Sequence, residues 1–279
     1  MDRIAALKKI TTEAACGDLT FPTGIDVALK IQRALDDPDC HIDAAARLVL
    51  AEPLLAARVV AIANSVAYNQ SGHIITDVRN AVSRIGLRTL GTVATALATR
   101  QMAGTSTNPQ IRAITAQLWE HTAHVAALAH VIARRVTHQD PETALFAGIV
   151  HEIGGFYLIS RAKDFPELLE GEPADWAEHA EAEIGRAILT RLTVPGAVMQ
   201  AIEAQWEGYL ALPPVTLGDT LILANELAPV TSPLNDINVP QNSDSSGPLI
   251  DSVIDQQTLS SILLESAAEV ESLTAALRF

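Results

Sequence analysis

Residues 145–158 read Leu-Phe-Ala-Gly-Ile-Val-His-Glu-Ile-Gly-Gly-Phe-Tyr-Leu, an apolar run interrupted by one adjacent His-Glu pair. Between Thr143 and Ser160, His151 and Glu152 are the only residues with strong acid–base character. A helix that is apolar on every side is a buried helix, so we predict one that runs through this stretch. An unpaired buried polar group costs about 1–3 kcal/mol. His151 and Glu152 must therefore be satisfied by hydrogen bonds, by each other or by a bound ion.

The whole chain has the composition of a helical protein. Its 279 residues are 48% hydrophobic but only 4% aromatic, and the apolar positions are mostly Ala, Leu, Ile and Val. Such residues suit close packing of helix against helix, and no alternating strand pattern of useful length occurs. Apolar periodicity with Pro and Gly punctuation predicts helices over residues 4–14, 25–35, 41–51, 53–63, 78–85, 87–102, 111–136, 140–160, 174–192, 195–206, 217–227 and 257–277. The expected fold class is all-α.

The helices fall into groups separated by polar segments. The run Gly104-Thr105-Ser106-Thr107-Asn108-Pro109 separates an N-terminal helical subdomain, residues 1–104, from a second subdomain, residues 105–229. Residues 230–256 are rich in Pro, Ser, Asn, Asp and Gly, which predicts an exposed loop or linker. Residues 257–279 form a C-terminal amphipathic helix. We predict that this helix packs back on the body, and a homodimer seam is the alternative.

Charge and cysteine usage limit the function classes. Lys and Arg number 19 against 33 Asp and Glu, a net charge of −14, and no basic stripe reverses it locally. Such a surface repels a phosphate backbone, so we expect no binding to nucleic acid duplexes. Cys16 and Cys40 are too isolated for a disulfide framework or a zinc site. With no signal peptide and no apolar run of about 18–20 residues, the expected location is cytoplasmic, without a membrane span. A protein partner, a small molecule or a metal ion remains open.

Histidines are the candidate functional residues. His121 lies near the apolar stripe of the 111–136 helix, His130 on its far side and His124 between them. For His151 and Glu152 two interpretations remain open. In the first, they form a structural pair whose polar groups make hydrogen bonds to each other and to neighbouring groups. In the second, they ligate a metal ion. His121 would share either role. The remaining histidines have no assignable partners and are interpreted as surface or boundary residues: His41, His73, His124, His130 and His138.

Several short motifs occur in a specific order. They are Phe21-Pro22, Ala51-Glu52-Pro53-Leu54-Leu55-Ala56-Ala57-Arg58-Val59, Ala63-Asn64-Ser65, Asn80-Ala81-Val82-Ser83-Arg84-Ile85-Gly86-Leu87, Leu118-Trp119-Glu120-His121, Gly148-Ile149-Val150-His151-Glu152-Ile153-Gly154, His179-Ala180-Glu181-Ala182-Glu183-Ile184-Gly185 and Val194-Pro195. With these motifs the chain resembles, from about Phe21 to Pro229, the HDOD family, the HD-related output domains of bacterial signalling proteins. The resemblance implies an N-terminal helical bundle packed on an HD-like helical bundle, here with an extra C-terminal helix.

The resemblance also implies a set of site residues. The parent HD superfamily are metal-dependent phosphohydrolases that use a His, a His-Asp pair and a later Asp. Imidazole and carboxylate groups hold a divalent ion, which lowers the pKa of bound water. Carried over by position, the set is His121, His151, Glu152 and Asn225, with His179 as a further candidate ligand. Two positions depart from the family pattern, because Glu152 and Asn225 stand where aspartates are expected.

Three function hypotheses follow. The first is a non-catalytic signalling module with a degenerate HD site that acts through a protein partner. The second is a metal-dependent phosphohydrolase acting on a nucleotide or cyclic dinucleotide. The third is a sensor that binds a nucleotide between the two subdomains without cleaving it. We prefer the first hypothesis, which involves no enzymatic activity. Whether the protein is an enzyme stays an open question. The preferred hypothesis requires no cofactor, although a divalent metal such as iron, manganese or magnesium would suit the site.

Overall fold

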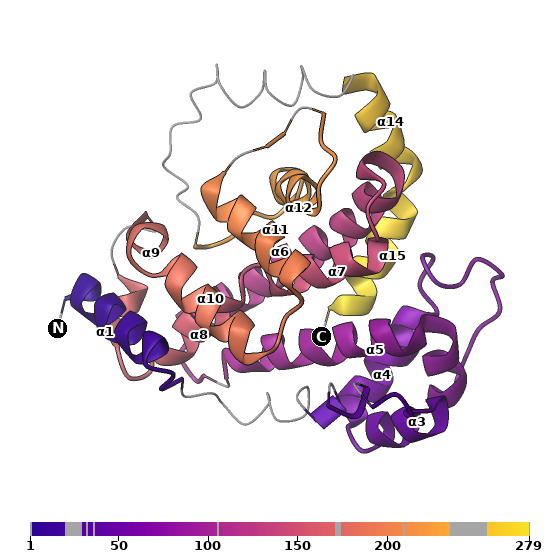
Figure 1. Ribbon diagram of the computed structural model, residues 1–279, viewed down its shortest axis with the longest axis horizontal. Helices are drawn as coiled ribbons and strands as arrows, with labels where there is room; N and C mark the ends of the chain where they lie inside the picture. Colours follow the sequence, from indigo (N-terminus) through magenta and orange to yellow (C-terminus); the bar gives the residue numbers. More distant parts are fainter. Residues whose placement is uncertain are drawn as a thin grey trace.

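The computed structural model describes residues 2–19, 30–31, 33–35, 37–104, 106–170, 174–208, 210–211, 213–234 and 256–278 (Figure 1). Every regular element in these ranges is a helix, which confirms the all-α prediction. The predicted helix 25–35 and the Phe21-Pro22 motif lie mostly or wholly outside the described residues. The helices are α1 (Arg3–Ala15), α3 (Ile42–Leu50), α4 (Pro53–Ala63), α5 (Val78–Met102), α6 (Pro109–Ile132), α7 (Pro141–Val150), α8 (Ile153–Arg161), α9 (Ala174–His179), α10 (Glu181–Arg191), α11 (Gly196–Glu207), α12 (Leu217–Glu226), α14 (Gln256–Glu265) and α15 (Ala267–Leu277), with a π-helical turn η1 (Ala133–Thr137) and a 3-10 turn η2 (Pro166–Leu169).

Helices α3, α4 and α5 pack together, with α3 and α4 on the opposite side of the protein from the N-terminus in Figure 1. The side chain of Asp77 caps α5 by accepting from the N–H of Asn80 at 2.9 Å. Within α5, Gly86 has φ 81° and ψ 167°, a conformation that L side chains rarely adopt. This kink confirms the predicted separation of a helix ending at residue 85 from one beginning at residue 87.

Helices α6 and α7 form the centre of the protein (Figure 1). They approach closely at Gly148, where a Cβ atom would lie 2.5 Å from the Cα of Ala126. The α-helical part of α6 ends at Ile132, earlier than predicted, and η1 continues it. That turn stops at His138, whose φ of 52° is left-handed. The close approach brings the helices that carry His121 and His151 into direct contact.

The predicted continuous helix through residues 145–158 is wrong in one respect, because α7 ends at Val150 and α8 begins at Ile153. The ring Nδ1 of His151 lies 2.7 Å from the Gly148 carbonyl, which an α-helix would offer to the N–H of residue 152. Glu152 then adopts φ −108° and ψ 27°, outside the helical region. The two polar residues thus sit at a break between two helices.

Two other long predicted helices are also interrupted. The helix predicted over 174–192 is divided into α9 and α10 at Ala180, whose φ is −148°. The helix predicted over 257–277 is divided into α14 and α15 at Ser266. In each case the apolar spacing continues across the break, so periodicity alone does not reveal it.

The segment Pro141–Arg161, which joins α7 and α8, is long and apolar enough to cross a membrane by length and composition. The prediction that no apolar run of about 18–20 residues occurs is therefore wrong by length and composition. In the structure, 89% of its most apolar window is buried inside the protein. These helices therefore form the core against which α5, α6, α11 and α12 pack.

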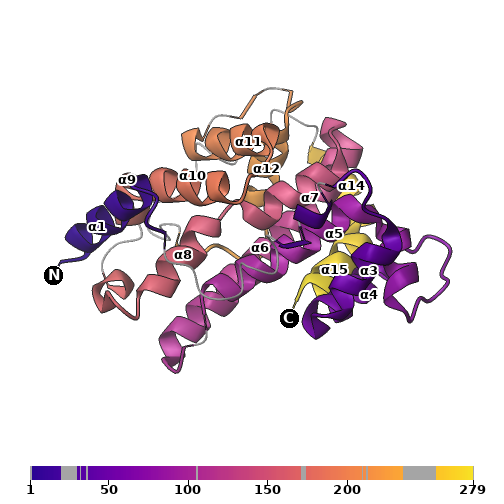
Figure 2. The same cartoon turned by 60° about the horizontal axis from the view of Figure 1, so that its bottom comes forward.

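The two ends of the chain pack on the second half of the protein. Helix α1 lies beside α9 and α10, away from α3 and α4, as both views show (Figures 1 and 2). Helix α15 packs on α6 and α4, and the indole N–H of Trp119 donates to the Leu277 carbonyl at 3.1 Å. The C-terminal helix therefore covers the core of its own chain. The predicted domain limits and the homodimer stay predictions.

Helix α12 is anchored by a buried carboxylate. Asp219 accepts hydrogen bonds from the backbone N–H groups of Ala211 (2.8 Å), Val215 (3.0 Å) and Thr216 (2.8 Å), and from the Thr216 hydroxyl (2.7 Å). Burial alone would raise the pKa of Asp219, but these hydrogen bonds outweigh it and hold the pKa below its usual value. The carboxylate therefore stabilises the connection between α11 and α12.

Asp219→Asn is expected to lower the free energy of unfolding at pH 7 by about 2 kcal/mol, because an amide oxygen replaces a charged acceptor. Since the folded-state pKa is depressed, this stabilisation is complete above the unfolded pKa of about 3.9 and is lost as the pH falls through the folded value. Urea unfolding at pH 7 and pH 3 measures it, with the exposed Asp43→Asn as control. An equal loss at both pH values would contradict the assignment to the ionised carboxylate.

Candidate metal centre

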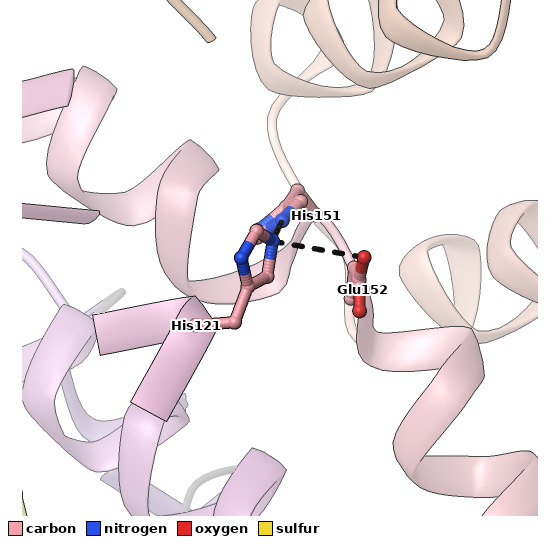
Figure 3. Close-up of side chains that lie close together, drawn as sticks. All are labelled: His121, His151 and Glu152. Atoms are coloured by element: carbon pink, nitrogen blue, oxygen red, sulfur yellow. Dashed lines mark hydrogen bonds and ion pairs between the residues drawn. The ribbon is translucent and has the colours of Figure 1, made fainter. Parts of the chain in front are cut away.

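His121 from α6 and the His151–Glu152 pair from the α7–α8 break converge on one point (Figure 3). The exposed fractions are 1% for His121, 3% for His151 and 8% for Glu152. One potential ligand atom from each residue lies within 4.8 Å of the other two. The break between the helices creates this arrangement, because it directs consecutive side chains toward α6.

The hydrogen bonds fix how the two imidazoles are protonated. The His121 Nδ1 lies 2.7 Å from the Val230 carbonyl oxygen, and the His151 Nδ1 lies 2.7 Å from the Gly148 carbonyl oxygen. A carbonyl oxygen only accepts, so each Nδ1 must carry the hydrogen. In each neutral ring the Nε2 then holds a lone pair, and the two Nε2 atoms are 3.3 Å apart.

Both rings are neutral at physiological pH. Burial, together with the smaller effect of a charge on His121, lowers the pKa of His151 to about 3. Burial also lowers the pKa of His121, against smaller opposing contributions from Val230 and Asn225. Two lone pairs therefore face each other, an arrangement that a cation between them would relieve. Imidazoles that donate their other N–H to a carbonyl are typical of metal ligands.

Glu152 provides an oxygen to the same point. Its Oε1 lies 3.8 Å from the Nε2 of His121, and its Oε2 accepts from the Ser232 hydroxyl at 2.8 Å. Burial raises the pKa of Glu152 to about 7, although the Ser232 hydrogen bond acts in the opposite direction. A buried carboxylate without a paired cation is costly, and a positive ion beside it would favour the ionised form.

Asn225 on α12 lies beside His121 and favours its protonated form. Its Oδ1 is nevertheless buried and makes no hydrogen bond of normal geometry. An unpaired buried amide oxygen is uncommon and is itself a suitable metal ligand. All four positions carried over from the HD pattern thus lie at or next to this point. On these observations the residues fit a divalent ion.

His179 does not join them in the structure. It lies on α9 near α1, where its carbonyl accepts from Thr11 at 3.5 Å and its side chain is one-quarter exposed. Glu181, which sequence reasoning missed, lines a small cavity with His151 and Glu152. Burial raises the pKa of Glu181 to about 7, and the charge of Glu152 adds to the effect. The unseen break at Ala180 explains the omission, because it changes which side chains face inward.

Residues 229–234, here called the closing segment, cover the site. Val230 and Ser232 bond to His121 and Glu152, and Leu234 packs against Gly155. Within the predicted exposed loop, Thr231 is exposed and its neighbours Val230 and Pro233 are half-buried, whereas Ser232 is fully buried with an exposed fraction of 0%. Residues 235–255 lie outside the described part of the chain. The cavity beneath the closing segment measures about 10 Å³, room for about one water molecule.

A third buried histidine corrects another prediction. His130, interpreted as a surface residue without partners, is 4% exposed. Its Nε2 lies 3.6 Å from Glu142 on α7, and its Nδ1 lies 3.6 Å from Glu269 on α15. Glu142 also accepts from the hydroxyls of Tyr68 and Thr89. This cluster connects α5, α6, α7 and α15.

Comparisons with known proteins agree with the fold. A model of the HDOD domain matches residues 21–207. A candidate metal-dependent phosphohydrolase from Shewanella amazonensis SB2B is 22% identical with a TM-score of 0.73, covering 98% of each chain. An HDOD domain protein with unknown function from Geobacter sulfurreducens is 21% identical with a TM-score of 0.61, again covering 98% of each. A candidate signal transduction protein from Marinobacter aquaeolei VT8 is 18% identical with a TM-score of 0.61, covering 99% of this chain and 66% of the other. No curated protein matches the chain.

Proposed function

This chain belongs to the HDOD domain family, and from that premise we propose that it is a regulatory signalling module that carries a divalent metal ion as a structural element. It acts through contacts with a protein partner rather than through turnover. The observation that carries the proposal is the closed site, in which facing imidazole lone pairs and a buried carboxylate lie beneath residues 229–234. The cytoplasmic location belongs to the same proposal.

His121, His151, Glu152 and Asn225 would hold the ion. Two imidazole nitrogens and one carboxylate suit iron or manganese better than magnesium, which prefers oxygen ligands. When bound, such an ion lowers the pKa of a coordinated water, the chemistry of HD phosphohydrolases. The residues of the chain orient the imidazoles through Gly148 and Val230 and exclude bulk water.

Access is the argument against catalysis. The cavity of about 10 Å³ has room for about one water molecule, far less than a phosphodiester requires. Val230 and Ser232 satisfy the polar groups of His121 and Glu152, which a substrate would otherwise meet. Because Asn225 is uncharged and stands where an aspartate is expected, the site also lacks a negative charge that a hydrolytic site would use to hold its metal. A closed and partly neutral site supports a structural rather than a hydrolytic role.

The test is elemental analysis by mass spectrometry of protein purified without chelator. We expect near-stoichiometric iron or manganese in the wild type and background levels in His151→Ala. The matched control is His124→Ala on α6, because the His124 ring bonds only to Glu120 within its own helix turn. Metal at background in the wild type, or equal loss in the control, would overturn the metal centre.

The same preparations are assayed with bis(p-nitrophenyl) phosphate, a general phosphodiester substrate. No turnover above the buffer rate is expected, with or without added metal. Turnover that disappears in His151→Ala would instead favour the runner-up, a metal-dependent phosphohydrolase. One observation supports that alternative. Glu181, with its pKa raised to about 7, is a carboxyl poised for general acid–base work beside Glu152.

A further inference from the structure

A second hollow of the protein lies between the end of α5 and the start of α6. It has a volume of about 400 Å³, within the range of about 300–1,000 Å³ typical of small-ligand sites. Its lining includes Arg100, Arg112, Ser106, Ile111 and Ala116. No acidic side chain belongs to the described lining, although the chain as a whole has a net charge of −14. The hollow is therefore a local exception to the acidic character of the protein.

Arg100 is the residue of this hollow whose positive charge has no partner among the described residues. Its side chain is half-buried, and its Nε is buried without a hydrogen-bond partner. Its guanidinium makes no ion pair with any carboxylate of the described residues. Burial lowers the pKa of Arg100 below its ordinary value, which reflects the cost of holding a charge away from water. A buried guanidinium nitrogen normally has a hydrogen-bond acceptor, so an anion in the hollow would be a suitable partner for Arg100.

Arg112 adds a second positive charge to the same hollow. It is exposed, and its Nη1 donates to the Thr107 carbonyl at 2.9 Å, a neutral acceptor that leaves its charge uncompensated. Elsewhere, arginines such as Arg88 and Arg161 pair with carboxylates. Both arginines face one hollow, and neither has an acidic partner in the described part of the chain. Such a pair is a donor set suited to bidentate phosphate contacts.

We propose that this hollow binds a small phosphorylated ligand of about the size of a nucleotide, with the phosphate on Arg100 and Arg112. The exposed Ala116, beside the largely buried Ile111, provides an apolar surface for a base or another flat group. The first turn of α6 contributes the positive end of its dipole, which favours an anion further. The ligand joins the two predicted subdomains at their seam.

This site is independent of the metal centre and of its chemistry. No residue of the hollow belongs to the His121, His151 and Glu152 group or to the closing segment. The metal centre and the phosphate site can therefore be disproved independently. The variants that test one of them leave the residues of the other unchanged.

The test is isothermal titration calorimetry of the full chain with pyrophosphate and with ADP and GDP. Arg100→Gln and Arg112→Gln are each expected to weaken binding by about tenfold, the loss of one charge-assisted bidentate contact. Arg47→Gln on α3 removes the same charge from an exposed position outside the hollow and is expected to change the affinity by less than about twofold. Pyrophosphate binding as tight as nucleotide binding would assign the site to the phosphate alone. Tighter binding of the nucleotides than of pyrophosphate would show that the base also contacts the site.

A second pair of variants keeps the test valid if Arg100→Gln is unstable. Ala116 is exposed on α6, and both Glu and Gln are good helix formers there. Ala116→Glu places a carboxylate in the hollow and is expected to abolish binding, whereas Ala116→Gln adds the same bulk without charge and is expected to retain part of it. The proposal is overturned if no wild-type binding occurs at about 1 mM ligand, or if Arg47→Gln weakens binding as much as Arg112→Gln.

Discussion

Gly148→Ala is expected to destabilise the protein by about 3 kcal/mol and to lower its melting temperature by roughly 5–10 °C. A Cβ at this position would lie 2.5 Å from the Cα and 2.8 Å from the backbone N of Ala126. Both atoms belong to the backbone of α6, so no side-chain rotation can relieve the overlap. The two helices must separate, and with them His121 and His151.

The matched control is Gly196→Ala, at the first position of α11, where an added Cβ meets no atom within 4 Å. This change is expected to be neutral or slightly stabilising, because alanine loses less backbone entropy than glycine. Differential scanning calorimetry of both variants measures the effect. A melting temperature of Gly148→Ala equal to that of the wild type would mean that α6 and α7 do not pack this closely.

Glu152→Gln is expected to stabilise the metal-free protein at alkaline pH. The pKa of Glu152 rises from its ordinary value of 4.5 to about 7 on folding, because burial penalises the charged form. The folded state therefore keeps a proton that the unfolded state has released, and stability falls as the pH rises from 4.5 through 7. The full penalty is on the order of 3 kcal/mol. The neutral amide avoids it.

Urea unfolding in excess chelator at pH 5 and pH 8 measures the difference. The variant is expected to be more stable than the wild type at pH 8 by on the order of 3 kcal/mol and nearly equal to it at pH 5. With metal present the sign reverses, because the wild type retains the ion and the variant loses a charged ligand. The exposed Glu207→Gln is the control. No gain at pH 8 without metal would show that the Glu152 carboxylate is not buried unpaired.

The sequence predicts the helices well and their interruptions poorly. Apolar spacing and terminal signals placed α4, α11 and α12 within a residue or two of their observed limits. The kink at Gly86 was predictable because glycine is a recognisable signal for a positive φ. At the break between α7 and α8 the His151 ring bonds to the Gly148 carbonyl, a side-chain interaction that apolar spacing does not reveal. The breaks at Ala180 and Ser266 have no capping side-chain hydrogen bond and also interrupt an apolar spacing that continues across them. The observed break at His151 and Glu152 forms the site.

The candidate ligands show the same limit. His121, His151, Glu152 and Asn225 could be proposed because they occupy the positions of a known pattern. Glu181 and the closing segment could not, because their proximity to the site follows from the packing of α8, α10 and α12. His130 was misinterpreted for a similar reason, since its partners Glu142 and Glu269 are distant in sequence. Long-range partners of buried polar residues cannot be inferred from helical periodicity alone.

The closing segment also has a kinetic consequence. An ion at His121 and His151 would be released when residues 229–234 give up their hydrogen bonds to His121 and Glu152. Exchange then proceeds through a local opening event, whose frequency depends on the stability of that segment. At high chelator concentration the rate of metal removal would become independent of the chelator and equal to the opening rate. A protein built in this way would retain a bound ion through brief falls in the free metal concentration and would respond only to prolonged depletion.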